Sequence, residues 1–512
     1  MRKFRSAFAV VLAAVMCLPF ALFASAAAED GSYEITNPYE NINWESVKAY
    51  KTALHTHTNA SDGDDILAAS IERHAQTGFD IVATTDHGTV NYSWIDPNPN
   101  KLVYGVMSLI GKTEGDLVYL GKEGTFSDGT AYTVAINEKG DEYLTLADGK
   151  QILRVPYGIE NNAVSVNAHV NSWFADYSDN SITTYEDAVI GVDKAGGVSV
   201  INHPGEYTKA RYEIRSENAY DESNPAYSYY INKFATLIND YDSCIGIDIN
   251  SKGDNRTRFD RILWDTLLKR FSANGENVYA IATSDAHQLN VIDTGYTLAL
   301  MEDNSSASLK AALQNGEIFA ASHCLGNYDE LVDIAAALKE YYGETALYNK
   351  VNTTALEMEA KILGIENGEY DADESIGITY STLENGFNTA SADPRITAIE
   401  VNEATDEITV NTTDALIVRF ISDGNLICTK KADDATIDLN DYADVLGDYV
   451  RIEVFGEGGM VYTQAFLLDA AAKAGTSDPV DSSYVNLGVL DFLFAEFNNW
   501  YAVIVRFFSN LF

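Results

Sequence analysis

Short apolar runs rich in β-branched residues alternate with longer amphipathic stretches between about residues 51 and 318. The short runs predict strands at 51–57, 79–85, 197–202, 245–250 and 278–284. The longer stretches predict helices at 65–77, 185–195, 256–273 and 305–315. Alternation of this kind is typical of parallel strands joined by crossover helices, so we expect an α/β fold, either a barrel or a doubly wound sheet.

The segment 101–155 departs from this alternation. Repeated turn signals, among them Ser127-Asp128-Gly129 and Ala147-Asp148-Gly149, separate short runs of Tyr, Val and Leu. Turns at this spacing predict β-hairpins. Because the segment lies between Asp86-His87 and Glu160, we expect a β-hairpin insertion near the mouth of the α/β unit.

Three further segments follow the alternating region. The pattern is largely helical over 327–363, polar and turn-rich over 366–393, and strand-like over 396–468, where apolar and polar residues alternate between turns. The last pattern predicts a small β-sandwich. We therefore expect an α/β unit at 45–325, a helical segment and linker at 326–393, and a β-sandwich at 394–470.

The N-terminus has the pattern of a cleaved secretory signal. Arg2, Lys3 and Arg5 precede an apolar stretch over 7–23, and small residues follow it before Glu29. We place the signal at 1–28 and expect a secreted or extracytoplasmic protein.

The C-terminal tail, 485–512, is rich in large apolar residues. Polar residues such as Asp491, Glu496 and Arg506 interrupt it, so no stretch of about 20 apolar residues spans it. An amphipathic helix that packs on protein or lies at a membrane interface fits this pattern better. We expect the tail to provide an interaction surface, either by packing on protein or by peripheral association with the cell envelope.

The formal net charge is −42. A surface this negative repels polyanions, which argues against long nucleic acid and anionic lipid as partners. A small phosphorylated substrate stays compatible, because a metal cluster reverses the local sign of the charge. Three cysteines remain after signal cleavage, at wide spacings, and they imply no disulfide framework.

Only eight histidines occur in the chain, and six of them lie in short motifs with carboxylates, glycine and small residues. Imidazole and carboxylate are the ligands that zinc, manganese and iron sites use. Nine ligands are too many for one ion, so we expect two or three divalent ions (Mn, Zn or Fe), with positions left for water and substrate. The candidate ligands are His55, His57, Asp62, His87, Glu160, His169, His203, Asp285 and His287.

The spacing of these residues supports a common site. They fall at the C-terminal ends of the predicted strands, where the active sites of (β/α) barrels lie. His55 and His57 are two apart on a strand and therefore share a face. The glycine in Ser61-Asp62-Gly63 permits a tight turn that returns Asp62 over the strand end. Glu160 and Asp285 are the carboxylates best suited to bridge ions.

For several other polar residues, a purely structural role stands beside a functional one. Asp86 either orients His87 or caps its turn. His74 is expected to be solvated on a polar helix face, and His323 to be structural. The candidate ligands for a substrate phosphate are Arg154, Lys209 and Arg211, although Lys and Arg side chains usually face solvent.

The ordered motifs resemble those of the PHP (polymerase and histidinol phosphatase) superfamily. They are His55-Thr56-His57 with Asp62-Gly63, Thr85-Asp86-His87, Gly158-Ile159-Glu160 with His169, His203-Pro204, and Ser284-Asp285-Ala286-His287. The likeness covers about residues 51–287, and residues 449–453 and 458–462 are similar to the C-terminal β-domain of secreted members. It implies a distorted (β/α)7 TIM-like barrel and a two- or three-metal phosphoesterase site with the nine residues as ligands. The insertion departs from the family pattern.

We therefore expect a secreted metal-dependent phosphoesterase that hydrolyses a small phosphorylated substrate through a metal-bridged hydroxide. Asp285 is expected to exchange a proton, and the neutral histidine His203 to protonate the leaving oxygen. Two alternatives stay open: a carboxylic ester or carbamate hydrolase using the same site, and a non-catalytic cell-surface binding protein. Structural metal sites are usually closed by four ligands, which disfavours the last.

Overall fold

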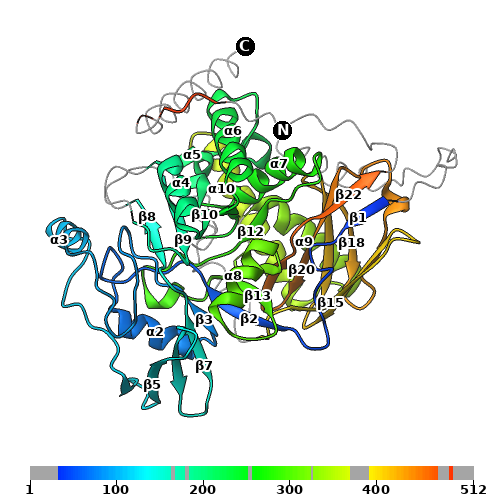
Figure 1. Cartoon of the computed structure of the whole chain (residues 1–512). Helices are drawn as coiled ribbons and strands as arrows, with labels where there is room; N and C mark the ends of the chain where they lie inside the picture. The colour runs from blue at the N-terminus through cyan, green and yellow to red at the C-terminus, as the bar shows by residue number, and fades with distance from the viewer. Residues whose placement is uncertain are drawn as a thin grey trace, which may run out of the picture.

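The computed structural model describes residues 33–162, 168–178, 184–251, 256–324, 327–369, 391–470, 484–487 and 490 (Figure 1). The expected signal, most of the 366–393 linker and most of the 485–512 tail lie outside these residues.

One sheet carries three of the candidate ligand motifs, those of Glu160 with His169, of His203 and of Asp285 with His287. Its strand order is β12-β11-β10-β9-β8. The pairs β10–β11 and β11–β12 are parallel, whereas β9 is antiparallel to both β8 and β10. The strands are β8 (Ile159–Asn161), β9 (Val170–Trp173), β10 (Val198–Ile201), β11 (Cys244–Asp248) and β12 (Tyr279–Ile281).

A second, larger sheet contains the first two strands of the α/β unit, β2 (Lys48–Ala53) and β3 (Ile81–Val82), paired in parallel. On its other side β2 pairs with β13 (Gly295–Met301), which pairs with β14 (Ile318–Ser322), both antiparallel. Two isolated parallel bridges, Thr56–Ala286 and His87–Glu160, link this sheet to the first. The α/β class is confirmed. Along the described residues the ladders of the α/β unit form two sheets joined by these bridges, so the closed barrel stays a prediction.

Helices follow the strands as the alternation predicts. In α7, Leu263, Leu267 and Phe271 fall on one face and are buried, so the helix is held by its apolar stripe. Figure 1 shows α4, α6 and α7 grouped beside β10 and β12. The helices are α2 (Leu67–Gln76), α4 (Tyr185–Ala195), α5 (Pro204–Thr208), α6 (Pro225–Asp240), α7 (Asp260–Ser272) and α8 (Ser306–Asn315).

The insertion at 101–155 is not purely β. It begins with a helix, α3 (Lys101–Leu109), which the turn signals did not predict, and continues into antiparallel strands. The last strand, β7, pairs in parallel with β3 and so belongs to the large sheet. The strands are β4 (Glu123–Thr125), β5 (Ala131–Ile136), β6 (Glu142–Leu146) and β7 (Gln151–Arg154).

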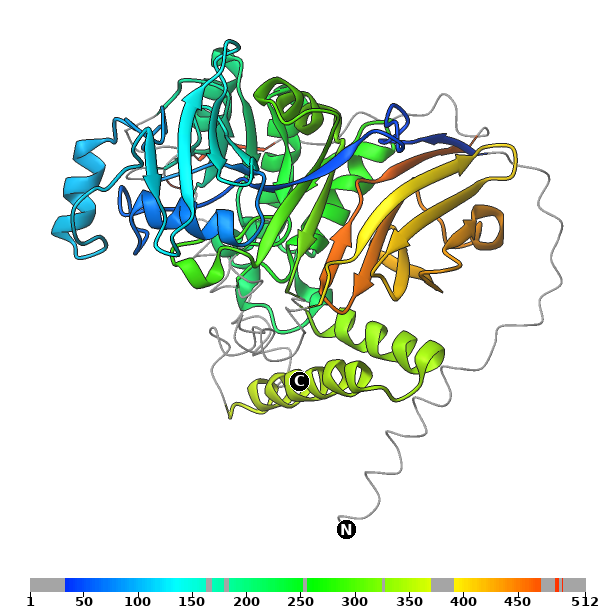
Figure 2. The ribbon, with the colours of Figure 1, turned by 90° about the horizontal axis from the view of Figure 1, so that it is seen from below.

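The C-terminal strands continue the large sheet. Strand β21 pairs with β14, and β1 pairs with β22, so the predicted sandwich shares a sheet with the α/β unit (Figure 2). A three-stranded sheet, β15-β16-β19, shares a buried apolar core with the large sheet. These strands are β1 (Tyr33–Thr36), β15 (Arg395–Asn402), β16 (Glu407–Thr413), β17 (Ile417–Ser422), β18 (Asn425–Lys431), β19 (Thr436–Asp438), β20 (Tyr449–Gly456), β21 (Gly459–Tyr462) and β22 (Phe466–Ala470).

Two helices precede these strands, α9 (Tyr328–Tyr342) and α10 (Ala346–Glu366). The residues described at the start of the C-terminal tail contact α4 and α6. The Tyr484 hydroxyl donates to Glu186 Oε1 at 2.8 Å, and the Leu487 amide donates to the Tyr229 hydroxyl at 3.3 Å. Among the described residues, no helix combines the length and apolar character needed to cross a membrane.

Candidate metal centre

Chain segments from both sheets bring the nine candidate ligands to one place. His55 and His57 follow β2, His87 follows β3, and Asp285 and His287 follow β12. His203 follows β10, and Glu160 lies within β8. His169 differs from expectation because it precedes β9. Since β9 runs antiparallel to its neighbours, its N-terminal end meets their C-terminal ends.

Asp62 reaches the cluster through the tight turn that its motif predicts. A Cβ at Gly63 would lie 2.8 Å from both the His57 carbonyl carbon and the Thr58 nitrogen, so only glycine allows this close approach. The Asp62 carboxylate lies 3.4 Å from His87 Nε2, 3.4 Å from His287 Nε2 and 3.6 Å from His57 Nδ1.

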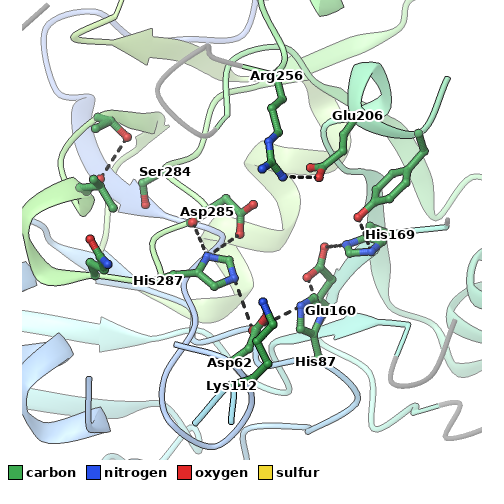
Figure 3. A pocket seen from close by; sticks show the side chains of 14 residues that line it. Asp62, His87, Lys112, Glu160, His169, Glu206, Arg256, Ser284, Asp285 and His287 are labelled. Atoms are coloured by element: carbon green, nitrogen blue, oxygen red, sulfur yellow. Dashed lines mark hydrogen bonds and ion pairs between the residues drawn. The ribbon is translucent and has the colours of Figure 1, made fainter. Parts of the chain in front are cut away.

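Glu160 stands at the centre of the cluster (Figure 3). Its carboxylate lies 2.8 Å from His87 Nδ1, 2.8 Å from His169 Nδ1 and 3.3 Å from His203 Nε2. His57 Nε2 lies 3.3 Å from the same carboxylate and 3.0 Å from Asp285 Oδ1. Glu160 and Asp285 therefore each lie close to several of the candidate ligand histidines, and their bridging role stays a prediction.

The ligand atoms fall into four overlapping groups, in each of which all the atoms lie within 4.8 Å of one another. Overlap means that several residues contribute to two groups, as expected of a multinuclear site. The groups are His57, Asp62, His87 and His287; His55, His203 and Asp285; His55, His57 and Glu160; and His87, Glu160 and His169.

Buried polar atoms without hydrogen-bond partners show that the cluster fits metal ions. Nδ1 of His55 and Nδ1 of His203 are buried and make no hydrogen bond within the protein. Leaving such groups unpaired costs free energy. Imidazole nitrogens and carboxylate oxygens arranged in this way are the donors that divalent transition metals require.

The backbone is also strained at two ligands. His203 has φ of 27° and Asp285 has φ of 46°, a region that L-residues rarely adopt. Such conformations persist only where the surrounding structure enforces them, and they concentrate at functional sites.

The electrostatics of the cluster favour bound cations. Burial by itself would raise the pKa of Glu160, but His169, His87 and His55 hold it well below its ordinary value. Burial opposes ionisation of Asp62 too, yet hydrogen bonds from His287 and His87 lower its pKa. Both carboxylates are therefore anionic at neutral pH and available to a metal.

Asp86 orients the loop that carries Asp62. Its carboxylate accepts hydrogen bonds from the Thr58 amide at 2.7 Å, the Thr58 hydroxyl at 2.8 Å and the Ser61 hydroxyl at 2.8 Å. These bonds fix the turn after His57, so Asp86 acts on the ligand loop rather than on His87 itself.

The expectation that His74 is solvated is wrong. Its side chain is fully buried; Nδ1 lies 2.7 Å from the Ser70 carbonyl oxygen and Nε2 lies 3.3 Å from the Thr56 hydroxyl. Thr56 lies between the ligands His55 and His57, so His74 contacts the segment after β2 that carries both ligands. Helical periodicity alone could not show that this face of α2 packs against β2.

Burial should make His74 a source of acid sensitivity. Burial lowers the pKa of His74 to about 4, from an ordinary value near 6.5, so the unfolded chain binds the proton more strongly. Stability therefore falls as the pH falls from about 6.5 towards 4. Between pH 7.5 and 4.5 we expect wild type to lose about 2–3 kcal/mol more unfolding free energy than His74→Gln.

Urea unfolding of metal-loaded wild type and His74→Gln at both pH values checks this expectation. The two proteins differ only at position 74, so the difference between their losses isolates His74. Equal losses in the two proteins would show that His74 does not carry the effect.

Two residues that support the cluster were not singled out from the sequence. The Asn162 amide bridges two ligands, with Oδ1 2.6 Å from His87 Nδ1 and Nδ2 2.6 Å from His169 Nε2. The Tyr207 hydroxyl lies 2.5 Å from His169 Nε2. Asn162 lies two positions after Glu160, just past the end of β8, and this spacing was the one available signal.

A cavity of about 500 Å³ opens onto the cluster. Asp62, Glu160 and Asp285 lie on its wall, whereas His203 is not among the lining residues. Two cationic side chains, Lys112 and Arg256, also line it (Figure 3).

The cationic residues that line the cavity are not the ones that the sequence suggested as phosphate ligands. Arg154 is buried and donates to Glu142 Oε2 at 3.2 Å and to the Asn91 carbonyl at 3.0 Å. Arg154, Lys209 and Arg211 do not line the cavity. Lys112 comes from the insertion, where no spacing signal linked it to the ligands.

Comparisons with known proteins are distant. Neither a protein-family model nor a curated protein matches the sequence. A two-domain protein from Bacteroides vulgatus, containing a predicted PHP-like metal-dependent phosphoesterase, matches over 87% of this chain and 92% of its own, with 13% identity and a TM-score of 0.31. An amidohydrolase from Chromobacterium violaceum with bound sulfate and no metal matches over 46% and 87%, with 15% identity and a TM-score of 0.22. At TM-scores this low, function has to be inferred from the side chains themselves.

Proposed function

We propose that this chain is a secreted metal-dependent phosphoesterase of the PHP type, acting on a small phosphorylated substrate. The observation that carries the proposal is the nine-residue ligand cluster beside a cavity with two cationic side chains on its wall. Two or three divalent ions (manganese, zinc or iron) suit its histidine and carboxylate donors. When bound, such ions polarise a phosphoryl oxygen and activate water.

The residues around the cavity have distinct roles in this proposal. Asp285 lies on the wall and accepts the proton released as water attacks. His203 is fully buried and off the wall, so we keep it as a ligand rather than as the proton donor. His287 is more accessible, with 33% of its side chain exposed, but it is also one of the nine ligands, so the proton that Asp285 accepts is the one returned to the leaving oxygen.

Lys112 and Arg256 favour a phosphoryl group over a neutral ester. Glu206 holds Arg256, with its Oε1 2.6 Å from Arg256 Nη1, and partly offsets its charge. Lys112 is exposed and immediately precedes Thr113, whose hydroxyl donates to the Asn59 carbonyl in the ligand loop at 2.9 Å. A dianionic phosphomonoester gains most from these two cations.

Lys112→Ala is expected to raise KM for phosphomonoesters roughly tenfold with little change in kcat, because the lost contact is made equally before and during reaction. Metal content should not change. Lys101→Ala, on the exposed start of α3 and off the cavity wall, is the matched control. Unchanged KM in Lys112→Ala would show that the side chain does not contact the substrate.

The main experiment is elemental analysis of the purified protein, with turnover of nucleotides, sugar phosphates and aryl phosphates. Aryl carboxylic esters and carbamates are assayed on the same preparation. Faster hydrolysis of the carbonyl substrates would replace the phosphoesterase proposal with the ester or carbamate alternative. Metal-loaded protein with no turnover on any substrate would favour a binding protein.

The location and partners are also proposals. The sequence of residues 1–28 supports export, and the composition of 485–512 supports peripheral association with the cell envelope. The high negative charge argues against long nucleic acid.

A further inference from the structure

A buried lysine lies between α4 and α6, away from the metal centre. The Lys233 side chain is fully buried, and its Nζ lies 3.0 Å from Glu186 Oε1. Lysine is rarely buried without an anionic partner, because burial costs the ammonium its hydration. Tyrosine rings surround the same ammonium, with centroids 5.1 Å (Tyr229), 5.5 Å (Tyr484) and 5.9 Å (Tyr185) from Nζ. Rings at these distances stabilise a desolvated cation.

The rings and the carboxylate come from segments that are far apart in the chain. Tyr185 and Glu186 begin α4, whereas Tyr229 and Lys233 lie one turn apart on α6. Tyr484 lies 298 residues after Glu186, and its hydroxyl donates at 2.8 Å to the same Glu186 Oε1 that Lys233 contacts. Tyr484 therefore contacts both members of the buried ion pair.

The residues after Tyr484 alternate between the protein and solvent. Tyr484 and Leu487 are partly buried and pack against the apolar core that contains Tyr185 and Tyr229. The Tyr229 and Tyr484 rings meet edge to face at 5.8 Å, and the Leu487 amide donates to the Tyr229 hydroxyl at 3.3 Å. Val485, between them, is 76% exposed. Figure 1 shows this short red segment beside α6.

We propose that residues 484–487 form a clasp that closes an aromatic cage over Lys233 and so fixes the start of the C-terminal tail to α4 and α6. The surface around Glu186, Tyr229 and Lys233 is thus an interaction surface whose partner is a segment of the same chain. The clasp sets the point from which the tail leaves the α/β unit. The proposal does not depend on which bond the metal centre hydrolyses.

The test is the accessibility of the Lys233 amine in the full-length mature protein, measured by mass spectrometry after brief acylation with N-hydroxysuccinimidyl acetate. The exposed Lys361 is the internal reference. Wild type should react slowly at Lys233, because the cage has to open first. Tyr484→Ala is expected to raise the rate of labelling at Lys233 roughly tenfold or more, because it removes both the ring and the hydroxyl.

Two further variants separate the parts of the clasp. Tyr484→Phe keeps the ring and should react more slowly at Lys233 than Tyr484→Ala. Leu487→Ser weakens the second attachment while leaving the cage intact, and it should give a smaller rise than Tyr484→Ala. It carries the test if Tyr484→Ala does not fold. The matched control is Val485→Ala, an exposed position in the same segment, which should react as wild type does.

Near-ultraviolet circular dichroism and an unchanged rate at Lys361 show that each variant is folded. Lys233 that reacts as fast as Lys361 in wild type would overturn the proposal, since the cage would then be open. Equal labelling of Lys233 in wild type, in folded Tyr484→Ala and in Leu487→Ser would show that the clasp does not cover it. A rate in Tyr484→Phe as high as in Tyr484→Ala would show that the ring does not close the cage. Labelling needs no substrate, so its result is separate from that of the turnover assays.

Discussion

Replacing His55 and His57 together with alanine is expected to lower turnover by roughly 10³-fold or more and to remove at least one metal ion, because activation of water needs the ions. His57 shares one ligand group with Asp62 and another with Glu160, while His55 joins the groups of Glu160 and Asp285. Losing both imidazoles leaves three of the four groups incomplete.

Elemental analysis and turnover on the same sample measure both effects. The control is His323→Ala, which removes a histidine away from the cluster, where it bonds to Asp393 at 2.9 Å. Near-ultraviolet circular dichroism checks that each variant is folded. If the double variant keeps its metal and its activity, the site lies elsewhere in the chain.

Asp265→Ala is expected to lower the free energy of unfolding by about 3–5 kcal/mol, the usual cost of leaving a buried charge without its partner. Asp265, on α7, receives two hydrogen bonds from Arg451 of β20, at 2.7 and 2.8 Å, and one from the Tyr449 hydroxyl at 2.7 Å. Arg451 is only 3% exposed. Removing the carboxylate leaves the Arg451 guanidinium paired with Glu453 but no longer with Asp265.

Denaturant unfolding measures the loss. Glu366→Ala, which breaks an exposed pair with Arg215 at 2.7 Å, is the matched control and should cost less than about 1 kcal/mol. A loss as small as the control's, or two separate unfolding transitions in wild type, would show that the C-terminal strands fold independently of the α/β unit.

Ion pairs like that of Asp265 join parts of the chain that the sequence pattern assigns to separate segments. Arg261 of α7 bonds to Glu330 of α9 at 2.7 Å, and Arg419 of β17 bonds to Asp333 of α9 at 3.2 Å. Together with the shared sheet between β14 and β21, these contacts make the C-terminal strands part of the support of the α/β unit. The shared sheet and the ion pairs therefore cross the expected segment boundaries at 326 and 394.

The sequence by itself determined the α/β class and the candidate ligands. Both depend on local signals: apolar periodicity gives strands and helices, and each ligand motif lies at a strand end. His55 and His57 share a face because side chains alternate along a strand, and Gly63 marks the turn that returns Asp62. Such relations span a few residues and need no knowledge of distant contacts.

Tertiary structure alone decided the rest, because the relevant partners are far apart in sequence. His74 is buried because α2 packs its face against Thr56, and Lys112 reaches the cavity because Thr113 bonds to Asn59. Strand β9 reverses direction between β8 and β10, which places His169 at the start of its strand. Hydrophobic periodicity specifies which face of an element is buried, but not which other element covers it. That choice follows from the packing of the whole chain.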